Sequence, residues 1–168
     1  MAAERTKHAG KVAAVRAVVE REVFGRGMPR AMGVRLISLT RKRVAAEMRI
    51  KPMHMNRSAR VNGGAIMAFA DVLGAAGTII NLLPGQRTAT LESKTNFFAA
   101  GEGLLLKAVS IPLHIGRTTM VWQTTITNSD GRKVAIVTQT QIVIPAGTDA
   151  APVRAKASAG KAQRRSGK

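Results

Sequence analysis

The stretch "NGGAIMAFADVLGAAGTIINLLPG", residues 62–85, constrains the fold of this chain more than any other feature. Wound as a helix, it is apolar around its whole circumference and offers no face suited to water. Its single acid, Asp71, lies in the middle. An aspartate at the centre of a bilayer costs about 2.5–3.5 kcal/mol even on the lenient insertion scales. We therefore expect a helix buried in a protein core and no membrane span.

The segments around this helix predict an α+β domain. Valines at three-to-four spacing in residues 11–24 predict an amphipathic surface helix that ends at "GRGMP". Residues 34–40 and 43–51 predict a hairpin of two strands. A hydrophobic period of two then predicts four more strands, at residues 88–99, 104–112, 117–128 and 133–144. The last three should form an antiparallel meander, and the sheet as a whole must wrap the apolar helix.

Composition excludes several kinds of site. The chain has 168 residues, the length of a single domain, and no cysteine, so neither a disulfide framework nor a thiolate nucleophile is available. Its three histidines are scattered and have no carboxylate at helical ligand spacing. We therefore expect no metal and no cofactor. A net charge of +18 could attract nucleic acid, but aromatic residues make up only 3% and no stacking platform accompanies the charge.

The charge distribution and the local composition divide the chain into three parts. Residues 1–30 predict a basic N-terminal arm with the amphipathic helix, and residues 31–145 predict the main domain. Residues 146–168 consist mostly of Ala, Gly, Ser, Lys and Arg, which predicts a disordered basic tail. No uninterrupted apolar segment follows the first basic residues, as a secretory signal requires, so a cytoplasmic location is expected.

Two glycines at the start of the apolar helix predict a possible reaction centre. The first N–H groups of a helix have no partner inside it and favour negative charge, so Gly63 and Gly64 could form an oxyanion hole or could simply allow tight packing. Asp71 lies eight residues after Gly63, about 12 Å along a helix axis. If the two act together, they come from different subunits, and the site lies across a dimer interface. Otherwise Asp71 is a structural acid held by hydrogen bonds.

At these residues the chain resembles a known family. "HMNRSARVNGGAIMAFAD" is similar to the signature of the PaaI-type (phenylacetate-pathway) hotdog-fold acyl-CoA thioesterases, in which Asn, His-Gly-Gly and Leu-Ala-Asp recur at fixed spacing. Asn56, Gly63, Gly64 and Asp71 fall on the matching positions. "TATLESKTNFFAAG" and the segment from "HIGRTT" to "IVIP" resemble the family's later strands. The similarity covers about residues 31–145 and implies a hotdog fold, with an antiparallel sheet wrapped around one long helix, in a homodimer or a dimer of dimers.

The resemblance also implies roles for individual residues. Asp71 would be the general base or the nucleophile, and the Gly63 N–H would polarise the thioester carbonyl. Asn56 would help to hold the carbonyl or the attacking water. Thr90 falls where relatives often place a hydroxyl near the reacting centre.

Four further positions bear on substrate binding. Asn62 stands where the family has its histidine, and asparagine cannot become a cation near neutral pH. It either contacts the substrate together with Gly64 or only caps the helix. Ala59 replaces a family glycine. Arg117 would contact a coenzyme A phosphate, although a solvated arginine at a strand end is the simpler alternative.

The implied activity is hydrolysis of an acyl-CoA thioester to a carboxylic acid and free coenzyme A. An acyl-CoA hydratase of the same fold would need an Asp–His pair, and no matching histidine is present. The remaining alternative is an acyl-CoA-binding or assembly protein that has lost catalysis, with Asn62 marking the loss.

Overall fold

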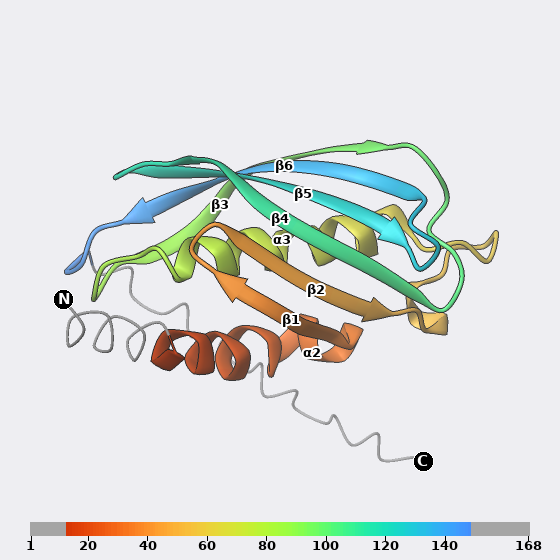
Figure 1. Ribbon diagram of the computed structural model, residues 1–168, viewed down its shortest axis with the longest axis horizontal. Coiled ribbons are helices and arrows are strands. Elements are labelled where there is room, and N and C mark those ends of the chain that lie inside the picture. Colours follow the sequence, from red (N-terminus) through yellow and green to blue (C-terminus); the bar gives the residue numbers. More distant parts are fainter. Residues whose placement is uncertain (1–12, 149–168) are drawn as a thin grey trace, which may run out of the picture.

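The computed structural model describes residues 13–148, which form one antiparallel sheet wrapped around a long helix (Figure 1). The helix is α3 (Gly63–Ile79). The six strands lie in the order β1-β2-β4-β5-β6-β3. Their bounds are β1 (Val34–Thr40), β2 (Arg43–Arg49), β3 (Arg87–Phe97), β4 (Leu105–Ile115), β5 (Thr119–Asn128) and β6 (Lys133–Ile144). The predicted α+β class, the hairpin and the meander of the last three strands are confirmed.

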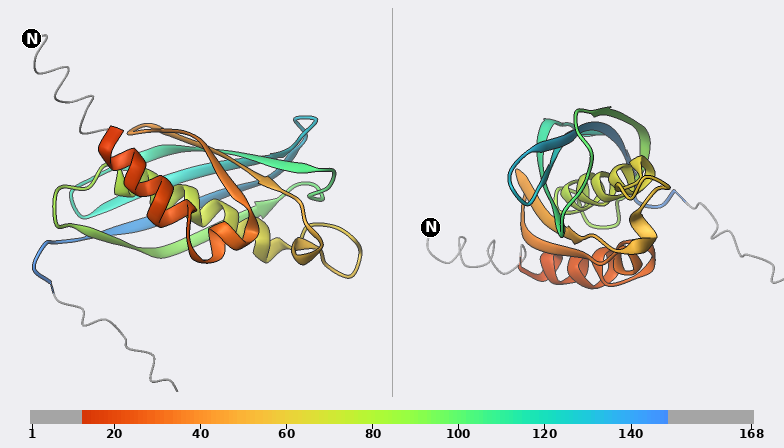
Figure 2. Two further views of the ribbon diagram at one scale, coloured as in Figure 1. Left: turned by 90° about the horizontal axis from the view of Figure 1, so that it is seen from below. Right: turned by 90° about the vertical axis from the view of Figure 1, so that its right-hand side faces the viewer.

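The sheet places two strands at its edges, and this arrangement determines where α3 is exposed. Within the described part of the chain, β3 pairs only with β6, and β1 pairs only with β2. The curved sheet therefore arches over α3 and leaves an open side between these two edges, and the N-terminal helix (residues 13–24) lies across from the arch (Figure 2). Half-buried or exposed residues of α3 recur on this open side at helical spacing: Gly64, Met67, Asp71, Ala75 and Ile79.

The N-terminal region differs from the prediction in one respect. The helix over residues 13–24 finishes in a π-helical turn, η1 (Glu20–Phe24), so it ends at "GRGMP" as predicted, but a further helix that was not predicted comes next. This second helix, α2 (Gly27–Met32), is capped at its C-terminus by Gly33, whose φ is 72°. Pro29 is accepted because it lies in the first turn, where a missing N–H breaks no helical hydrogen bond.

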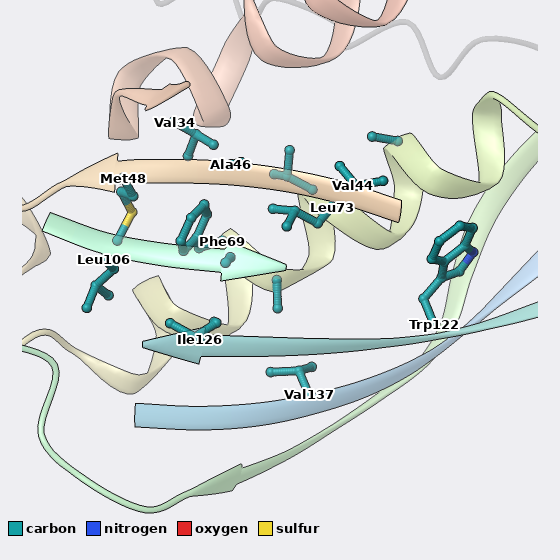
Figure 3. Close-up of a cluster of buried hydrophobic side chains, with 14 of the residues drawn as sticks. Val34, Val44, Ala46, Met48, Phe69, Leu73, Leu106, Trp122, Ile126 and Val137 are labelled. Carbon is teal, nitrogen blue, oxygen red and sulfur yellow. The ribbon is translucent and has the colours of Figure 1, made fainter. Parts of the chain in front are cut away.

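The core lies between α3 and the concave face of the sheet. Phe69 and Leu73 of α3 pack among side chains such as Met48, Trp122 and Ile126 from the strands, all of them fully buried (Figure 3). The helix ends at Ile79, several residues before the predicted stop at "LPG". Within residues 13–148, no helix is long and apolar enough to cross a membrane.

Small residues let α3 approach the sheet closely. A Cβ atom on Gly77 would lie 2.7 Å from the ring of Trp122, so only glycine fits there. The indole Nε1 donates to Thr78 Oγ1 over 3.0 Å, which satisfies both buried polar groups.

The domain boundaries given by the sequence remain predictions. Residues 1–12 of the basic arm and residues 149–168 of the predicted disordered tail lie outside the described residues. The described part of the chain passes without interruption from the N-terminal helix into the sheet.

Candidate active site

Asp71 is held from two directions through one of its carboxylate oxygens. Thr90 of β3 donates from Oγ1 to Asp71 Oδ1 over 2.8 Å. Gln139 of β6 donates from Nε2 to the same oxygen over 3.2 Å. Within residues 13–148, no hydrogen bond reaches Asp71 Oδ2, which leaves this oxygen for a water or a substrate. The structure therefore brings together Asp71 and Thr90, two of the predicted site residues.

Two buried glutamines extend this network, and the sequence analysis missed both. Gln139 and Gln141 alternate along β6, and each is only 1% exposed. Gln141 Nε2 donates to Thr90 Oγ1 over 2.8 Å, so the hydroxyl accepts one hydrogen bond and donates another to Asp71. Gln139 Oε1 is buried and has no partner among the described residues. The signal was the pattern "VTQTQIV", in which glutamine takes two successive buried positions of an alternating strand.

Gly74 makes the contact between Gln139 and Asp71 possible. A Cβ on this residue would lie 2.3 Å from the amide carbon of Gln139, so any side chain would displace the amide. The glycine sits on α3 one turn after Asp71. The sequence thus provides both the acid and the space for the amide that holds it.

The N-terminus of α3 offers one free backbone donor. Asn62 is the N-cap, and its Oδ1 accepts from the Gly64 N–H over 2.8 Å. The Gly64 N–H is therefore occupied by the cap. The Gly63 N–H makes no hydrogen bond with any described residue. The ring of Phe97, at the end of β3, lies over Gly63, since a Cβ there would be 3.2 Å from Phe97 Cζ.

The loop before α3 holds Asn56 in a fixed orientation. Its Oδ1 accepts from the N–H groups of Ser58 and Arg60 over 2.9 and 3.1 Å, in the manner of an Asx turn. Its Nδ2 has no partner among the described residues, so the amide is turned with its donor side free. Ala59 has a φ of 54°, a left-handed conformation that glycine adopts without strain. This geometry explains why the family pattern has glycine at that position.

A buried histidine supports the same loop. His54 is 2% exposed, its Nδ1 accepts from the Lys51 N–H, and its carbonyl oxygen accepts from the Asn62 N–H over 2.7 Å. Burial lowers the pKa of His54 below its usual value, and the charge on Lys51 lowers it further. The neutral imidazole is therefore the form that the folded loop favours.

Within one chain the structure does not join the two halves of the predicted site. Gly63 and Asp71 are eight residues apart on the same helix, about 12 Å along its axis. Arg117 is exposed in the turn between β4 and β5, beside Thr118, whose carbonyl accepts from Val143 near the end of β6. The N-terminus of α3 lies instead near the start of β4, where Val61 bonds to Gly101.

The described residues contain no group of three His, Cys, Asp or Glu side chains placed to hold a metal ion. The hydrogen bonds above build the candidate site from one carboxylate, amides, a hydroxyl and a backbone N–H.

Comparisons with known proteins place this arrangement in a family. Residues 59–135 match the thioesterase superfamily. A Deinococcus radiodurans protein described as a candidate esterase is 31% identical over 131 residues, which cover 73% of this chain and 80% of that protein. The E. coli PaaI protein from the phenylacetic acid degradation operon has a TM-score of 0.73 at 19% identity, over 82% of this chain and 96% of that one. A hypothetical thioesterase of Streptococcus pneumoniae TIGR4, solved with coenzyme A, has a TM-score of 0.62 at 25% identity, over 67% of this chain and 87% of that one.

The chain belongs to the thioesterase superfamily, as the motif resemblance predicted, and it shares its fold with the E. coli PaaI protein. The predicted hotdog fold is confirmed: the sheet of β1 to β6 curves around the central helix α3. The roles of the individual site residues stay predictions.

Proposed function

We propose that this protein hydrolyses an acyl-CoA thioester to a carboxylic acid and free coenzyme A. The main supporting observation is the geometry of Asp71. One carboxylate oxygen is fixed by Thr90 and Gln139, and the other is free on the open side of the sheet. A carboxylate that is oriented by two donors and still has an unpartnered oxygen is suited to act on a bound water or carbonyl. The streptococcal relative that holds coenzyme A supports this class of substrate.

The proposed reaction needs a second copy of the chain. β3 is a long edge strand whose N–H and C=O groups are unpaired on one side, and natural proteins seldom leave such an edge uncovered. Leu91, Phe97 and Phe98, in or next to β3, are 60%, 50% and 58% exposed in the single chain. We infer that two β3 edges pair about a two-fold axis in a homodimer.

The spacing of residues along β3 allows this pairing to bring the two halves of the site together. Thr90 contacts Asp71, and Phe97 lies over Gly63. An antiparallel pairing centred between Ser93 and Lys94 sets Thr90 of one chain opposite the partner's Phe97. Asp71 of one chain then faces the partner's Gly63, and two equivalent sites form at the interface.

In the proposed mechanism Asp71 is the general base. Its free oxygen takes a proton from a water as that water adds to the thioester carbonyl carbon. The partner's Gly63 N–H donates to the oxyanion that develops, and the free Nδ2 of the partner's Asn56 is a second donor. The C–S bond then breaks, the carboxylic acid forms, and the coenzyme A sulfur takes up the proton. The alternative, in which Asp71 attacks the carbonyl itself, forms an anhydride with release of coenzyme A, and water-derived oxygen enters Asp71 when water opens this anhydride at the Asp71 carbonyl.

Asn62 and Arg117 have more limited roles in this proposal. Asn62 fixes the start of α3 through its cap bond to Gly64, so both residues help to position the Gly63 N–H. Arg117 is exposed at the far end of the sheet and could meet a coenzyme A phosphate.

The direct test is release of free coenzyme A from a panel of short, long and aromatic acyl-CoAs. A rate of coenzyme A release that is proportional to the enzyme concentration supports hydrolysis. Tight binding of every acyl-CoA without release of coenzyme A would contradict it, and would favour the non-catalytic acyl-CoA-binding alternative.

A further inference from the structure

The open side of the sheet holds an apolar groove that contains none of the candidate active-site residues. Its volume is about 620 Å³, within the range of ligand pockets. The N-terminal helix forms one wall, and the end of α3 with the loop after it forms the other. Ten residues of the described part of the chain line it, and of these only Arg41 and Gln86 are polar. The apolar walls include Val15, Val18, Ile79, Leu82, Leu83 and Pro84.

This groove continues the exposed stripe of α3 that carries Asp71. Ile79, which lines the groove, is eight residues after Asp71, so it lies about 12 Å further along the same helix. Ala75 is the residue between them on this face, and its methyl group is too small to block a path. The groove thus lies in line with the carboxylate, in the direction opposite to Gly63.

The groove has the chemistry of a hydrocarbon site. Its walls are aliphatic, and Val18 and Leu83 remain 46% and 67% exposed, so the described residues leave them partly uncovered. Among the described residues, no acidic side chain and no aromatic ring lines it. A straight aliphatic chain gains most from such walls, because each buried methylene contributes free energy and asks for no polar partner.

We propose that this groove binds the distal part of a medium- or long-chain fatty acyl group while the thioester carbonyl lies at Asp71. The proposal rests on the proposed acyl-CoA hydrolysis and names its substrate class. An extended chain advances about 1.2 Å per bond, so about ten bonds are needed to reach from Asp71 to Ile79. The preferred substrates are therefore acyl-CoAs of about ten carbons or more.

The test compares butanoyl-, octanoyl-, dodecanoyl- and hexadecanoyl-CoA. We expect kcat/KM to rise by up to about fourfold for each methylene that enters the groove. Leu83→Asp places a charge on the groove wall and should lower kcat/KM for dodecanoyl-CoA by at least about tenfold, with butanoyl-CoA changed less than about twofold. Leu104→Asp is the matched control, because Leu104 is 76% exposed and lies outside the groove.

A second variant keeps the test valid if Leu83→Asp does not fold. Ala14→Trp should fill the groove from the exposed side of the N-terminal helix, whereas Ala17→Trp, on the same helix, should not. Equal kcat/KM for all four chain lengths, or equal losses in variant and control, would overturn the proposal. So would a change of oligomeric state in Leu83→Asp, since the groove would then be an interface between copies.

Direct binding separates this inference from the proposed function. If the protein released coenzyme A from none of the four substrates, hydrolysis of acyl-CoA would be wrong. Calorimetry with dodecanoyl- and butanoyl-CoA would still show whether the groove binds the acyl chain. Tighter binding of the longer chain, lost in Leu83→Asp and kept in Leu104→Asp, supports it, and equal binding of the two overturns it.

Discussion

Thr90 Oγ1 donates a hydrogen bond to Asp71 Oδ1 over 2.8 Å, and this bond joins the edge strand β3 to the middle of helix α3. Because β3 has a neighbouring strand on one side only, its position depends on whatever covers its free edge. Pairing of two β3 edges would therefore hold Thr90 in place as well as bring in the second half of the site. Assembly and the orientation of Asp71 are coupled in this proposal.

Replacing Asp71 by asparagine removes the charge and keeps the size. We expect Asp71→Asn to lower thioester turnover by at least about a hundredfold, the scale of lost general-base assistance. Thermal melting and size measurements on the same variant show whether the dimer still forms. Near-normal turnover per folded molecule would sink the catalytic assignment and would make Asp71 a structural acid.

Hybrid dimers test whether the site is shared. Gly63→Pro removes the N–H at the first helical position, where proline is otherwise tolerated. Asp71→Ala removes the carboxylate. Each variant alone should be nearly inactive, but a hybrid dimer of the two contains one intact site and should recover up to about half of the activity per dimer.

Gly63→Ala is the control for the hybrid experiment, because it keeps the N–H and adds only a methyl group near Phe97. If hybrids confirmed by mass recover no activity, the shared-site geometry is wrong.

Substitutions of two glycines on α3 should have different effects, one mainly on turnover and the other mainly on stability. Gly74→Ala pushes the flexible amide of Gln139 away from Asp71, so we expect turnover to fall by about tenfold or more with a small change in melting temperature. Gly77→Ala meets the rigid, buried ring of Trp122 instead and should cost roughly 1–3 kcal/mol of stability. Turnover per folded molecule and thermal melting, measured on both variants, give the answer. The opposite pattern would show that Gln139 does not position the carboxylate.

The sequence predicts most of the fold because the last two strands, β5 and β6, alternate between buried and half-buried residues. The alternation of β5, with Met120 and Trp122 inside, could therefore be read directly. The pairing of β3 with β6 could not, because no local pattern specifies which strands become neighbours. α2 was missed because Gly27 and Pro29 are typical of a helix end as well as a helix start.

The candidate site was predictable where a residue breaks its local pattern. Asp71 and the glycine pair are exceptions within an apolar helix, and the sequence points to both. Gln139 and Gln141 share a strand face with valines, but glutamine is also common on the solvent side of a strand, so this pattern is a weaker signal than Asp71. Their burial follows from the contact between β6 and α3, which depends on Gly74 and on the three-dimensional fold.

His54 predicts a loss of stability in acid. Burial lowers its pKa in the folded state, so the unfolded chain binds a proton more readily than the folded one. Its contribution to stability is therefore complete above about pH 6.5 and is lost as the pH falls from there through the folded pKa. Denaturant unfolding between pH 5 and 8 measures this dependence.

His54→Asn keeps an acceptor near Nδ1 and should flatten the dependence on pH in this window. His114→Asn is the control, because His114 is exposed. An unchanged pH profile in His54→Asn would show that another group is responsible.

Ala59 offers a stabilising substitution in the loop that carries Asn56. With φ at 54°, its methyl group is strained by about 1–2 kcal/mol. Glycine relieves the strain but adds about 0.4–1 kcal/mol of chain entropy to the unfolded state. We expect Ala59→Gly to raise the free energy of unfolding by roughly 0.5–1 kcal/mol, measured by denaturant titration. The control is Ala17→Gly, the same change in an exposed helical turn, which should instead lower the free energy of unfolding by up to about 1 kcal/mol. Equal destabilisation by both substitutions would show that the conformation at Ala59 is not strained.

Because the loop orients Asn56 through the N–H groups of Ser58 and Arg60, turnover by Ala59→Gly should stay within about twofold of the original as long as those bonds persist.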